Sequence, residues 1–420
     1  MKWNRWAVPV AAALLLTACS AAWRQGEVVM VQNEKVTIRI MAGQSTSDAG
    51  SEDMIDAALR EAFPEVDFQW ICMDWGDGFD QQMTSRFAAG QMPDILIGKA
   101  QDVPVYQKLG AILPLPQEAC EGIAPDAMEL VTIEGEPYGL PYNVLYQGVL
   151  YNREIFRELG LSAPRTRDEL EEIVDRCEEA GYTSFGLHYG ETWSIANLTM
   201  QFWVNDLLLQ DPAWGQKAME GARSFTTDGL AADAFEQCRY MLEHSYEDAT
   251  QINQLECNKR FAEGNTAMLM TGTWSVQVIS QLNPEMDMGI FPYPNTTGDA
   301  RLLQETNMTF MKGNTTANSE LVDEILLKIG TDAELAEEIA ELTLAAPTLL
   351  SLEPADYSVI GQMVADFDRD KETANVSLGN NQLVWAFQND VAQQTLYWLK
   401  GERTRDELLQ YADQTLHMYK

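Results

Sequence analysis

Residues 36–98 read VTIRIMAGQSTSDAGSEDMIDAALREAFPEVDFQWICMDWGDGFDQQMTSRFAAGQMPDILIG. Apolar residues recur with period two in some parts of this stretch and with helical spacing in others, which indicates alternating strands and helices. The predicted order is strand 36–40, helix 54–62, strand 66–70, helix 79–87 and strand 94–98. This β-α-β-α-β order is typical of a mostly parallel sheet covered by helices, whose ligands bind beyond the carboxyl ends of the strands. The loops at 43–50 and 98–102 should therefore lie at the ligand-binding edge.

The second part of the chain has the same α/β character. A turn-rich run from Glu134 to Tyr142 precedes an apolar run, and we place the first crossing between two lobes there. Thr166 followed by Glu169, and Thr404 followed by Glu407, have the spacing of a capping box at the start of a helix. A strand pattern follows the first of these helices, so the second lobe should also combine a sheet with helices.

The first residues have the pattern of an export signal. Lys2 and Arg5 precede an apolar stretch at 7–17 that is far too short to span a bilayer, which indicates a signal peptide. It ends in Leu16-Thr17-Ala18-Cys19, which resembles the lipobox of bacterial lipoproteins. We expect a signal peptide over 1–18, lipid on Cys19 and a short lipidated tether over 19–35. An ordinary signal peptide that happens to carry a cysteine is the alternative.

Composition limits the class of protein. The remaining residues are too many for one core and suit two domains, and no later segment reaches the roughly 18 apolar residues of a membrane helix. There are 64 Asp and Glu against 28 Lys and Arg, for a formal charge of −36. Nucleic acid is excluded as a partner because binding it requires a basic surface. The acidic charge does not itself identify a ligand.

Reactive side chains are few or wrongly spaced for catalysis. Five further cysteines are an odd number without a C-x-x-C pair, so no disulfide framework is indicated, although one pair remains open: Cys72, Cys120, Cys177, Cys238 and Cys257. The three histidines form no metal motif, and no nucleophile elbow or phosphate-binding glycine loop is present. We expect no enzyme activity, no metal and no cofactor.

Several short motifs, in a fixed order, resemble those of one family. They are Met92-Pro93-Asp94-Ile95, Tyr138-Gly139-Leu140-Pro141-Tyr142, Leu150-Tyr151-Asn152-Arg153, the run 261–274 (FAEGNTAMLMTGTW), Pro292-Tyr293-Pro294 and the run 401–408 (GERTRDEL). The chain is similar to the extracellular solute-binding proteins of ABC importers, family 1, in the sugar-binding branch that includes maltose-binding protein. Each piece is weak alone, but their number and order carry the resemblance.

The resemblance implies a two-lobed clamshell in which each lobe is a sheet flanked by helices and the chain crosses between lobes more than once. Carried over by motif, lobe 1 takes 36–143 and 292–333, and lobe 2 takes 144–291 and 334–420. It also implies a monomer that binds a carbohydrate, specifically an oligosaccharide, closes around it and hands it to a membrane permease. Together with the lipid expected on Cys19, this favours the extracellular face of a single-membrane bacterium.

Sugar rings present apolar faces and a rim of hydroxyls, so a sugar site needs flat aromatic surfaces and hydrogen-bonding side chains. Trp274 occupies the position at which the family commonly stacks a sugar, and Trp193, in the polar loop 190–194, is where the family often places another aromatic. Trp385 is a third candidate. Core packing is the alternative for Trp274 and for Trp385, which has the most apolar surroundings, and a role on the lobe surface is the alternative for Trp193.

Six polar residues are candidates for the hydroxyl rim: Gln44, Ser45, Asp94, Tyr142, Asn143 and Asn307. Alternatively, Asp94 could fix the local backbone and Tyr142 could pack the hinge. Two other functions remain open. The same fold could bind a peptide, a polyamine or a metal, or a protein this acidic could be a surface glycosidase with paired carboxylates. The sequence does not specify the sugar, its linkage or its length.

Overall fold

The computed structural model describes residues 35–43, 50–73, 79–352, 359–378 and 382–419. The predicted signal peptide, Cys19 and most of the predicted tether lie outside the described residues. From Val36 onward the described residues belong to one compact unit. No helix within the described ranges is long and apolar enough to cross a membrane.

The first 60 or so residues of this unit form the predicted β-α-β-α-β arrangement. The elements are β1 (Val36–Gly43), α2 (Ser51–Ala62), β2 (Val66–Met73), α3 (Phe79–Ala88) and β3 (Ile95–Gly98). Strand β1 pairs in parallel with β2 on one side and with β3 on the other. Ile38, Ile40 and Ile97 are fully buried in the core under these strands. Burial of alternate residues explains the alternating apolar pattern in the sequence. The prediction for this part is confirmed.

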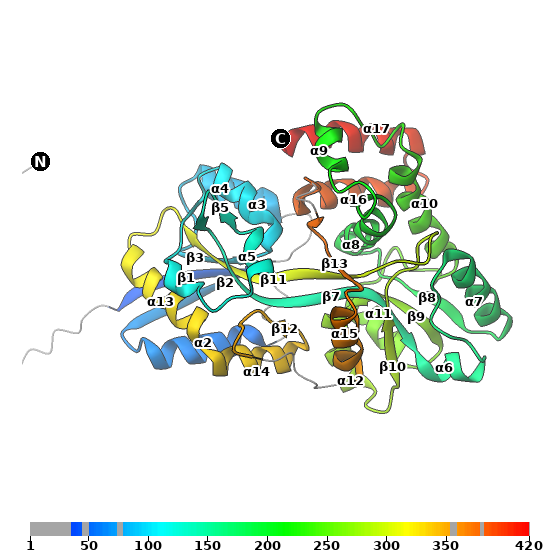
Figure 1. The fold of residues 1–420 in the computed structure, drawn as a ribbon, viewed down its shortest axis with the longest axis horizontal. Helices are drawn as coiled ribbons and strands as arrows, with labels where there is room; N and C mark the ends of the chain where they lie inside the picture. Colours follow the sequence, from blue (N-terminus) through cyan, green and yellow to red (C-terminus); the bar gives the residue numbers. More distant parts are fainter. Residues whose placement is uncertain (1–34, 44–49, 74–78, 353–358, 379–381, 420) are drawn as a thin grey trace, which may run out of the picture. The chain divides into compact units, whose positions relative to one another are not determined.

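Two long strands carry the chain between the halves of the sheet. They are β7 (Leu140–Asn152) and β11 (Leu302–Gly313), which pair antiparallel along most of their length. Strand β11 also pairs with β3, whereas β7 also pairs with β9 (Thr266–Gly272). The short strand β12 (Ala346–Pro347) adds a third segment beside β7. Figure 1 shows these strands running between the two helix-covered parts. We call β7, β11 and β12 the hinge strands.

The second half of the sheet extends from β7. It contains β9, β8 (Thr183–Gly186) and β10 (Met288–Phe291), and the helices around it include α6 (Arg153–Glu158), α7 (Arg167–Glu179), α8 (Thr192–Phe202), α10 (Gly229–Glu243), α11 (Gln254–Ala262), α12 (Val276–Leu282), α15 (Val359–Arg369), α16 (Trp385–Leu399) and α17 (Arg405–Leu416). Both predicted capping boxes are present, at the starts of α7 and α17. In each, the threonine hydroxyl accepts from the N3 backbone and the N3 glutamate accepts from the threonine backbone.

The sheet is mixed rather than mostly parallel. Parallel pairing holds for β1 with its two neighbours and for β8 with β9, as the sequence pattern predicts. The hinge strands are antiparallel because β7 carries the chain out of the first lobe and β11 carries it back. The two-lobed α/β fold with repeated crossing between lobes is confirmed by this topology and by the similar solved structures described below.

Side-chain packing groups some segments differently from the predicted lobe boundaries, which themselves stay a prediction. Helix α14 (Ala333–Thr343) buries Leu335 and Ile339 in the core cluster of β1 and β3. Tyr293 is instead buried in the core cluster of the second lobe, with its ring edge-on to Phe202. Packing therefore favours placing α14 in lobe 1 and the residues around Tyr293 in lobe 2.

None of the five cysteines in the described part of the chain forms a disulfide. Four are buried, and burial raises the pKa of the Cys120 and Cys177 thiols to about 11. Thiols in apolar surroundings stay protonated and behave as small hydrophobic side chains. The remaining one, Cys72, is partly exposed, with its sulfur 2.9 Å from Glu52 Oε2.

Candidate functional site

The loop that follows β3 places two polar side chains against a carboxylate on the hinge. Lys99 and Gln101 are both largely buried, although their residue types usually lie in solvent. Lys99 Nζ lies 2.7 Å from Glu305 Oε1 on β11, and Gln101 Nε2 donates to the same oxygen at 3.0 Å. This loop, 98–102, is one of the two that the sequence places at the ligand-binding edge.

Side chains from β7 and α16 complete a network around Glu305. Gln147 Nε2 donates to Glu305 Oε2 at 2.8 Å, so both carboxylate oxygens accept hydrogen bonds. Gln388 Nε2 donates to Gln101 Oε1 at 3.3 Å, and the Lys99 ammonium lies 3.4 Å from the centre of the Trp385 ring. We call the six residues joined by these contacts the central network: Lys99, Gln101, Gln147, Glu305, Trp385 and Gln388.

Three buried polar atoms in and beside the central network have no hydrogen-bond partner among the described residues. They are Gln147 Oε1, Trp385 Nε1 and Trp274 Nε1. A buried polar group without a partner costs about 1–3 kcal/mol. A ligand that supplies hydroxyl groups could satisfy both the acceptor and the two donors.

Trp274 lies beside the network because of the pairing between β9 and β7. Its ring packs over Gly272, where a Cβ atom would meet the ring at 2.1 Å. Gly272 is directly opposite Gln147 in the antiparallel pair, and opposed residues direct their side chains to the same face of a sheet. The Trp274 ring therefore lies on the face that carries Gln147 and Glu305. A side chain at position 272 would displace the ring, which explains the glycine.

Trp193 lies next to Trp274. The two ring centres are 6.4 Å apart with an angle of 62° between the planes, and both side chains are half-buried. Trp193 is in the first turn of α8, so the prediction of a loop at this position is wrong, because the helix begins at Thr192. Half-buried, adjoining aromatic rings can offer a face to a ligand without being part of a closed core.

A histidine and a carboxylate adjoin Trp193. The His188 ring centre lies 4.9 Å from that of Trp193, and His188 Nδ1 lies 3.2 Å from Glu191 Oε2. Burial alone would raise the pKa of Glu191, but hydrogen bonds from His188 and the Gln254 backbone hold it below its ordinary value. Glu191 is thus already engaged within the second lobe.

Trp385 packs in the core rather than offering a free ring. It is only 2% exposed, it begins α16, and it belongs to the core cluster of the second lobe. One face of its ring carries the Lys99 ammonium, an arrangement worth about 2 kcal/mol or more when the pair is desolvated. The structure favours the packing alternative, although the ring still borders the site.

The structure does not bring Asp94 to this site. It precedes β3, at the amino end of the strand, whereas the site lies at the carboxyl end. Asp94 Oδ2 accepts from the backbone nitrogen of Arg39 at 2.9 Å and from its Nε at 3.3 Å. These contacts agree with the alternative interpretation, in which Asp94 fixes the local backbone.

The other rim candidates divide between the faces of the hinge. Successive side chains of a strand point to opposite faces, so Asn143 shares the face of Gln147 and Tyr142 does not. Asn143 is buried, and its Oδ1 has no partner among the described residues. The Tyr142 ring packs against Phe310 with centres 5.4 Å apart, and burial raises the pKa of its phenol above the usual range.

The remaining three candidates cannot be placed by side chain. Asn307 is in β11 and its backbone pairs with Asn143, but its side chain is outside the described part. Gln44 and Ser45 lie outside the described residues altogether. Their roles stay predictions.

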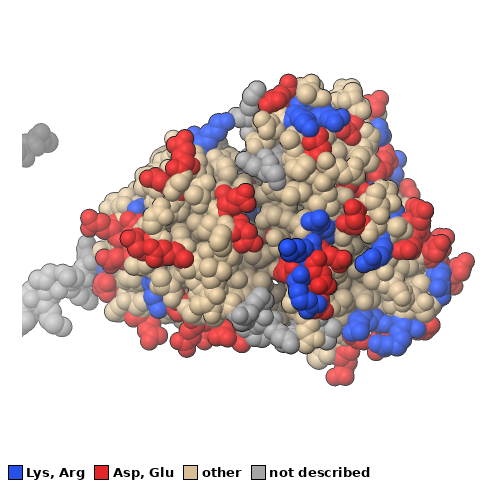
Figure 2. All heavy atoms as spheres, viewed as in Figure 1, with Lys and Arg blue, Asp and Glu red and all other residues tan. Residues whose placement is uncertain are grey.

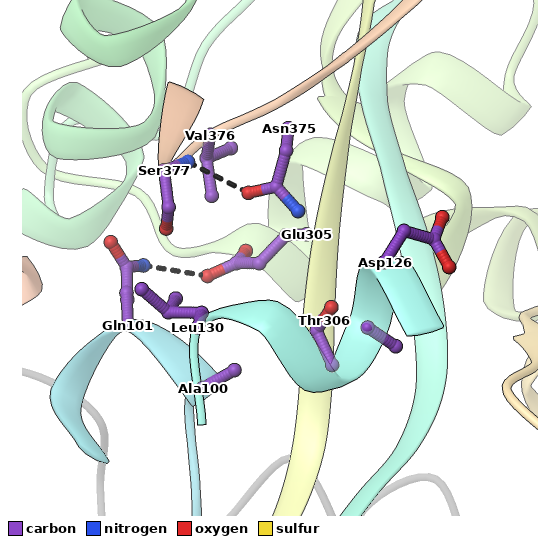
Figure 3. A pocket seen from close by; sticks show the side chains of 10 residues that line it. Ala100, Gln101, Asp126, Leu130, Glu305, Thr306, Asn375, Val376 and Ser377 are labelled. Atoms are coloured by element: carbon purple, nitrogen blue, oxygen red, sulfur yellow. Dashed lines mark hydrogen bonds between the residues drawn. The ribbon is translucent and has the colours of Figure 1, made fainter. Parts of the chain in front are cut away.

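A small pocket opens beside Glu305. Its lining residues come from the loop after β3, helix α5 (Pro125–Glu129), β11 and the segment after β13 (Thr373–Asn375): Ala100, Gln101, Asp126, Ala127, Leu130, Glu305, Thr306, Asn375, Val376 and Ser377. Figure 3 shows Gln101 and Ser377 on one side of Glu305 and Asp126 on the other. Two amides, two hydroxyls and two carboxylates form the polar lining, which holds no Lys or Arg.

The described residues contain no cluster of three or more His, Cys, Asp or Glu side chains that could hold a metal ion. The face of the molecule in Figure 2 carries acidic side chains over most elements, with smaller groups of basic ones among them, as the net charge of −36 implies. A site built from amides, aromatic rings, an internally paired carboxylate and a second, exposed carboxylate, Asp126, is suited to noncovalent binding of a polar, hydroxylated molecule.

The sequence analysis missed Lys99, Gln101, Gln147, Glu305 and Gln388. For the first two a signal existed, because they lie in the loop predicted at the ligand-binding edge. Gln147 interrupts a largely apolar strand, and a polar residue in such a position is buried and needs a partner. Glu305 stands in a polar run of β11, so its burial had no such signal in the sequence.

Comparison with known proteins identifies the family of this chain. A family model described as bacterial extracellular solute-binding protein matches residues 42–326. The multiple sugar-binding protein of Streptococcus mutans is 22% identical over 309 residues, covering 70% of each chain. The melibiose/raffinose/stachyose-binding protein of Bacillus subtilis is 23% identical, covering 67% of this chain and 65% of its own length, slightly less than two thirds.

Solved structures share the fold. A chitin oligosaccharide binding protein superimposes with a TM-score of 0.78 at 18% identity, covering 92% of this chain and 99% of its own. A sugar transporter protein from Bacillus licheniformis in complex with stachyose gives a TM-score of 0.76 at 16% identity, covering 92% and 100%. Because the family model matches more than half of the length of this chain, the chain belongs to the bacterial extracellular solute-binding proteins.

Proposed function

We propose that this protein captures a carbohydrate, specifically an oligosaccharide, between its lobes and delivers it to an ABC permease. The observation that carries the proposal is the position of the Trp193–Trp274 pair on the sheet face of Gln147, where a buried amide oxygen and a buried indole lack partners among the described residues. Aromatic rings suit the apolar faces of sugars and unpartnered amides suit their hydroxyls. The relatives named for melibiose, raffinose, stachyose and chitin oligosaccharides support the same ligand class.

Binding would act through hinge closure rather than chemistry. The three hinge strands join the lobes, and a ligand that contacts both lobes stabilises the state in which they are closest. The single carboxylate of the central network, Glu305, has donors on both of its oxygens, which suits a binding role better than proton transfer. Release of reducing sugar by the purified protein would contradict a binding-only function.

A thermal-shift panel tests the ligand class. We expect raffinose, stachyose or diacetylchitobiose to stabilise the protein, because a ligand that binds only the folded state adds about 2.7 kcal/mol at 100 times its Kd. Spermidine, dipeptides and Zn²⁺ serve as controls for the alternative solutes. Stabilisation by one of these controls, without stabilisation by any sugar at millimolar concentration, would contradict the proposal.

We also propose that lipid on Cys19 holds the monomeric protein at the extracellular face of a single-membrane bacterium, beside its permease. The diacylglyceryl group of a lipoprotein carries two acyl chains, and two chains hold a binding domain at the membrane where one would bind only marginally. In cells producing the full chain, we expect the wild type in the membrane fraction and Cys19→Ala in the medium. Cys72→Ala is the matched control and should stay with the membrane. Membrane retention of Cys19→Ala would contradict the anchor.

A further inference from the structure

Inside the site, the positive charge of Lys99 is compensated by the negative charge of Glu305. Lys99 is the only Lys or Arg in the central network, and the pocket lining has none. Its side chain is 9% exposed, with Glu305 Oε1 at 2.7 Å and the Trp385 ring centre at 3.4 Å. An ammonium held between a carboxylate and an aromatic face has little left to offer an anionic ligand.

The carboxylates of the site are equally unavailable to a cationic ligand. Glu305 accepts from Lys99, Gln101 and Gln147, which occupy both oxygens. Asp126, the other pocket carboxylate, is exposed, so water and salt screen its charge. Near the tryptophan pair, Glu191 is engaged by His188 and the Gln254 backbone.

Neutral groups remain for the ligand. Gln147 Oε1 and Trp274 Nε1, which have no partner among the described residues, can exchange hydrogen bonds with ligand hydroxyls, and the Ser377 hydroxyl lines the pocket beside Glu305. A ligand carboxylate would instead lose its hydration beside Glu305 with no cation free to replace it. The net charge of −36 opposes an anion at longer range as well.

We infer that the site selects uncharged carbohydrates over acidic ones, and that the buried Lys99–Glu305 pair on the hinge is the specificity-determining element. This inference rests on the proposed carbohydrate function and narrows it. Glu305 acts by keeping Lys99 neutralised, and Lys99 acts by keeping Glu305 from attracting amines.

The test uses matched ligands that differ in one group. Stachyose, raffinose or diacetylchitobiose, whichever binds, is compared by calorimetry with the same sugar oxidised from CH₂OH to a carboxylate at the C6 position of its nonreducing end. We expect the wild type to bind the acidic form at least about tenfold more weakly, because the carboxylate is desolvated without a partner. Equal or tighter binding of the acidic form would overturn the inference and leave the carbohydrate function intact.

Glu305→Gln tests the role of the pair. This change keeps an oxygen acceptor but leaves Lys99 without its counter-charge, so the acidic sugar should supply it. We expect the Kd of the acidic sugar divided by the Kd of the neutral sugar to fall at least about tenfold relative to the wild type. An unchanged ratio in a folded variant would overturn the assignment to Lys99 and Glu305. If the variant does not fold, the wild-type comparison still decides whether acidic sugars are excluded.

Asp126→Asn is the matched control, since it removes the same charge from the exposed side of the pocket. We expect the ratio to change by less than about threefold because solvent screens this carboxylate. If Asp126→Asn lowered the ratio as much as Glu305→Gln does, the selectivity would depend on the total charge of the site, and the role of the pair would be overturned. If no sugar binds any form, the carbohydrate function itself fails, which is a different outcome from a failure of selectivity.

Discussion

Glu305→Ala is expected to lower the free energy of unfolding by about 3–5 kcal/mol, the usual cost of leaving one member of a buried ion pair alone. Glu305 is 4% exposed and accepts from three side chains that come from the loop after β3 and from β7. Removing it leaves the Lys99 ammonium and two amide donors buried without an acceptor. Urea denaturation followed by far-UV circular dichroism measures the loss.

A double variant separates the charge from the packing. Lys99→Met combined with Glu305→Gln removes both charges, keeps similar volumes and leaves an acceptor for the neighbouring amides. Replacing a buried pair by neutral groups is often nearly neutral, so most of the lost stability should return. Asp126→Ala, on the exposed rim, should stay within about 0.5 kcal/mol of the wild type. A Glu305→Ala variant as stable as the wild type would mean that the pair contributes nothing to the fold.

The local structure of this protein was predictable because it depends on neighbours in the sequence. The capping boxes at Thr166 and Thr404 and the strands around Ile38 and Ile97 are fixed by spacings of two to four residues. Such patterns remain visible whatever the rest of the chain does. The α/β character of both lobes could therefore be predicted without any long-range information.

The central network was not predictable in the same way. Its contacts join the loop after β3 to β11, β7 and α16, which are far apart in the chain. A single sequence does not say which buried polar residue meets which. The tryptophans were found because an aromatic residue is a candidate wherever it occurs, but the sequence could not say that Lys99 would cover the face of Trp385.

Asp94 and Trp193 illustrate the two kinds of positional error. Asp94 immediately precedes a strand that was correctly predicted, and only the opposite end of that strand faces the site. Trp193 was assigned to a loop because polar residues and Gly190 surround it, whereas tertiary packing starts α8 one residue earlier. Both errors concern where an element begins, which is the least reliable part of a sequence-based prediction.

Trp274→Ala is expected to weaken sugar binding by about 1–3 kcal/mol, the typical contribution of an aromatic side chain at the centre of a binding site. The ring lies over Gly272 on the face of Gln147, and it is the neighbour of Trp193. Its loss would remove the stacking surface and one unpartnered indole donor. Isothermal calorimetry with the sugar identified in the panel measures the change as an increase of about 5- to 150-fold in Kd.

Folding should survive this change because the Trp274 ring is half-buried rather than enclosed in the core. Trp70→Ala is the matched control: Trp70 is also partly buried, but it is on β2 at the far edge of the sheet, and its indole donates to Asp56. The control can lose stability through that hydrogen bond, yet its Kd should equal that of the wild type. If Trp274→Ala binds as tightly as Trp70→Ala, Trp274 does not contact the ligand, and the stacking surface must be sought at Trp193 alone.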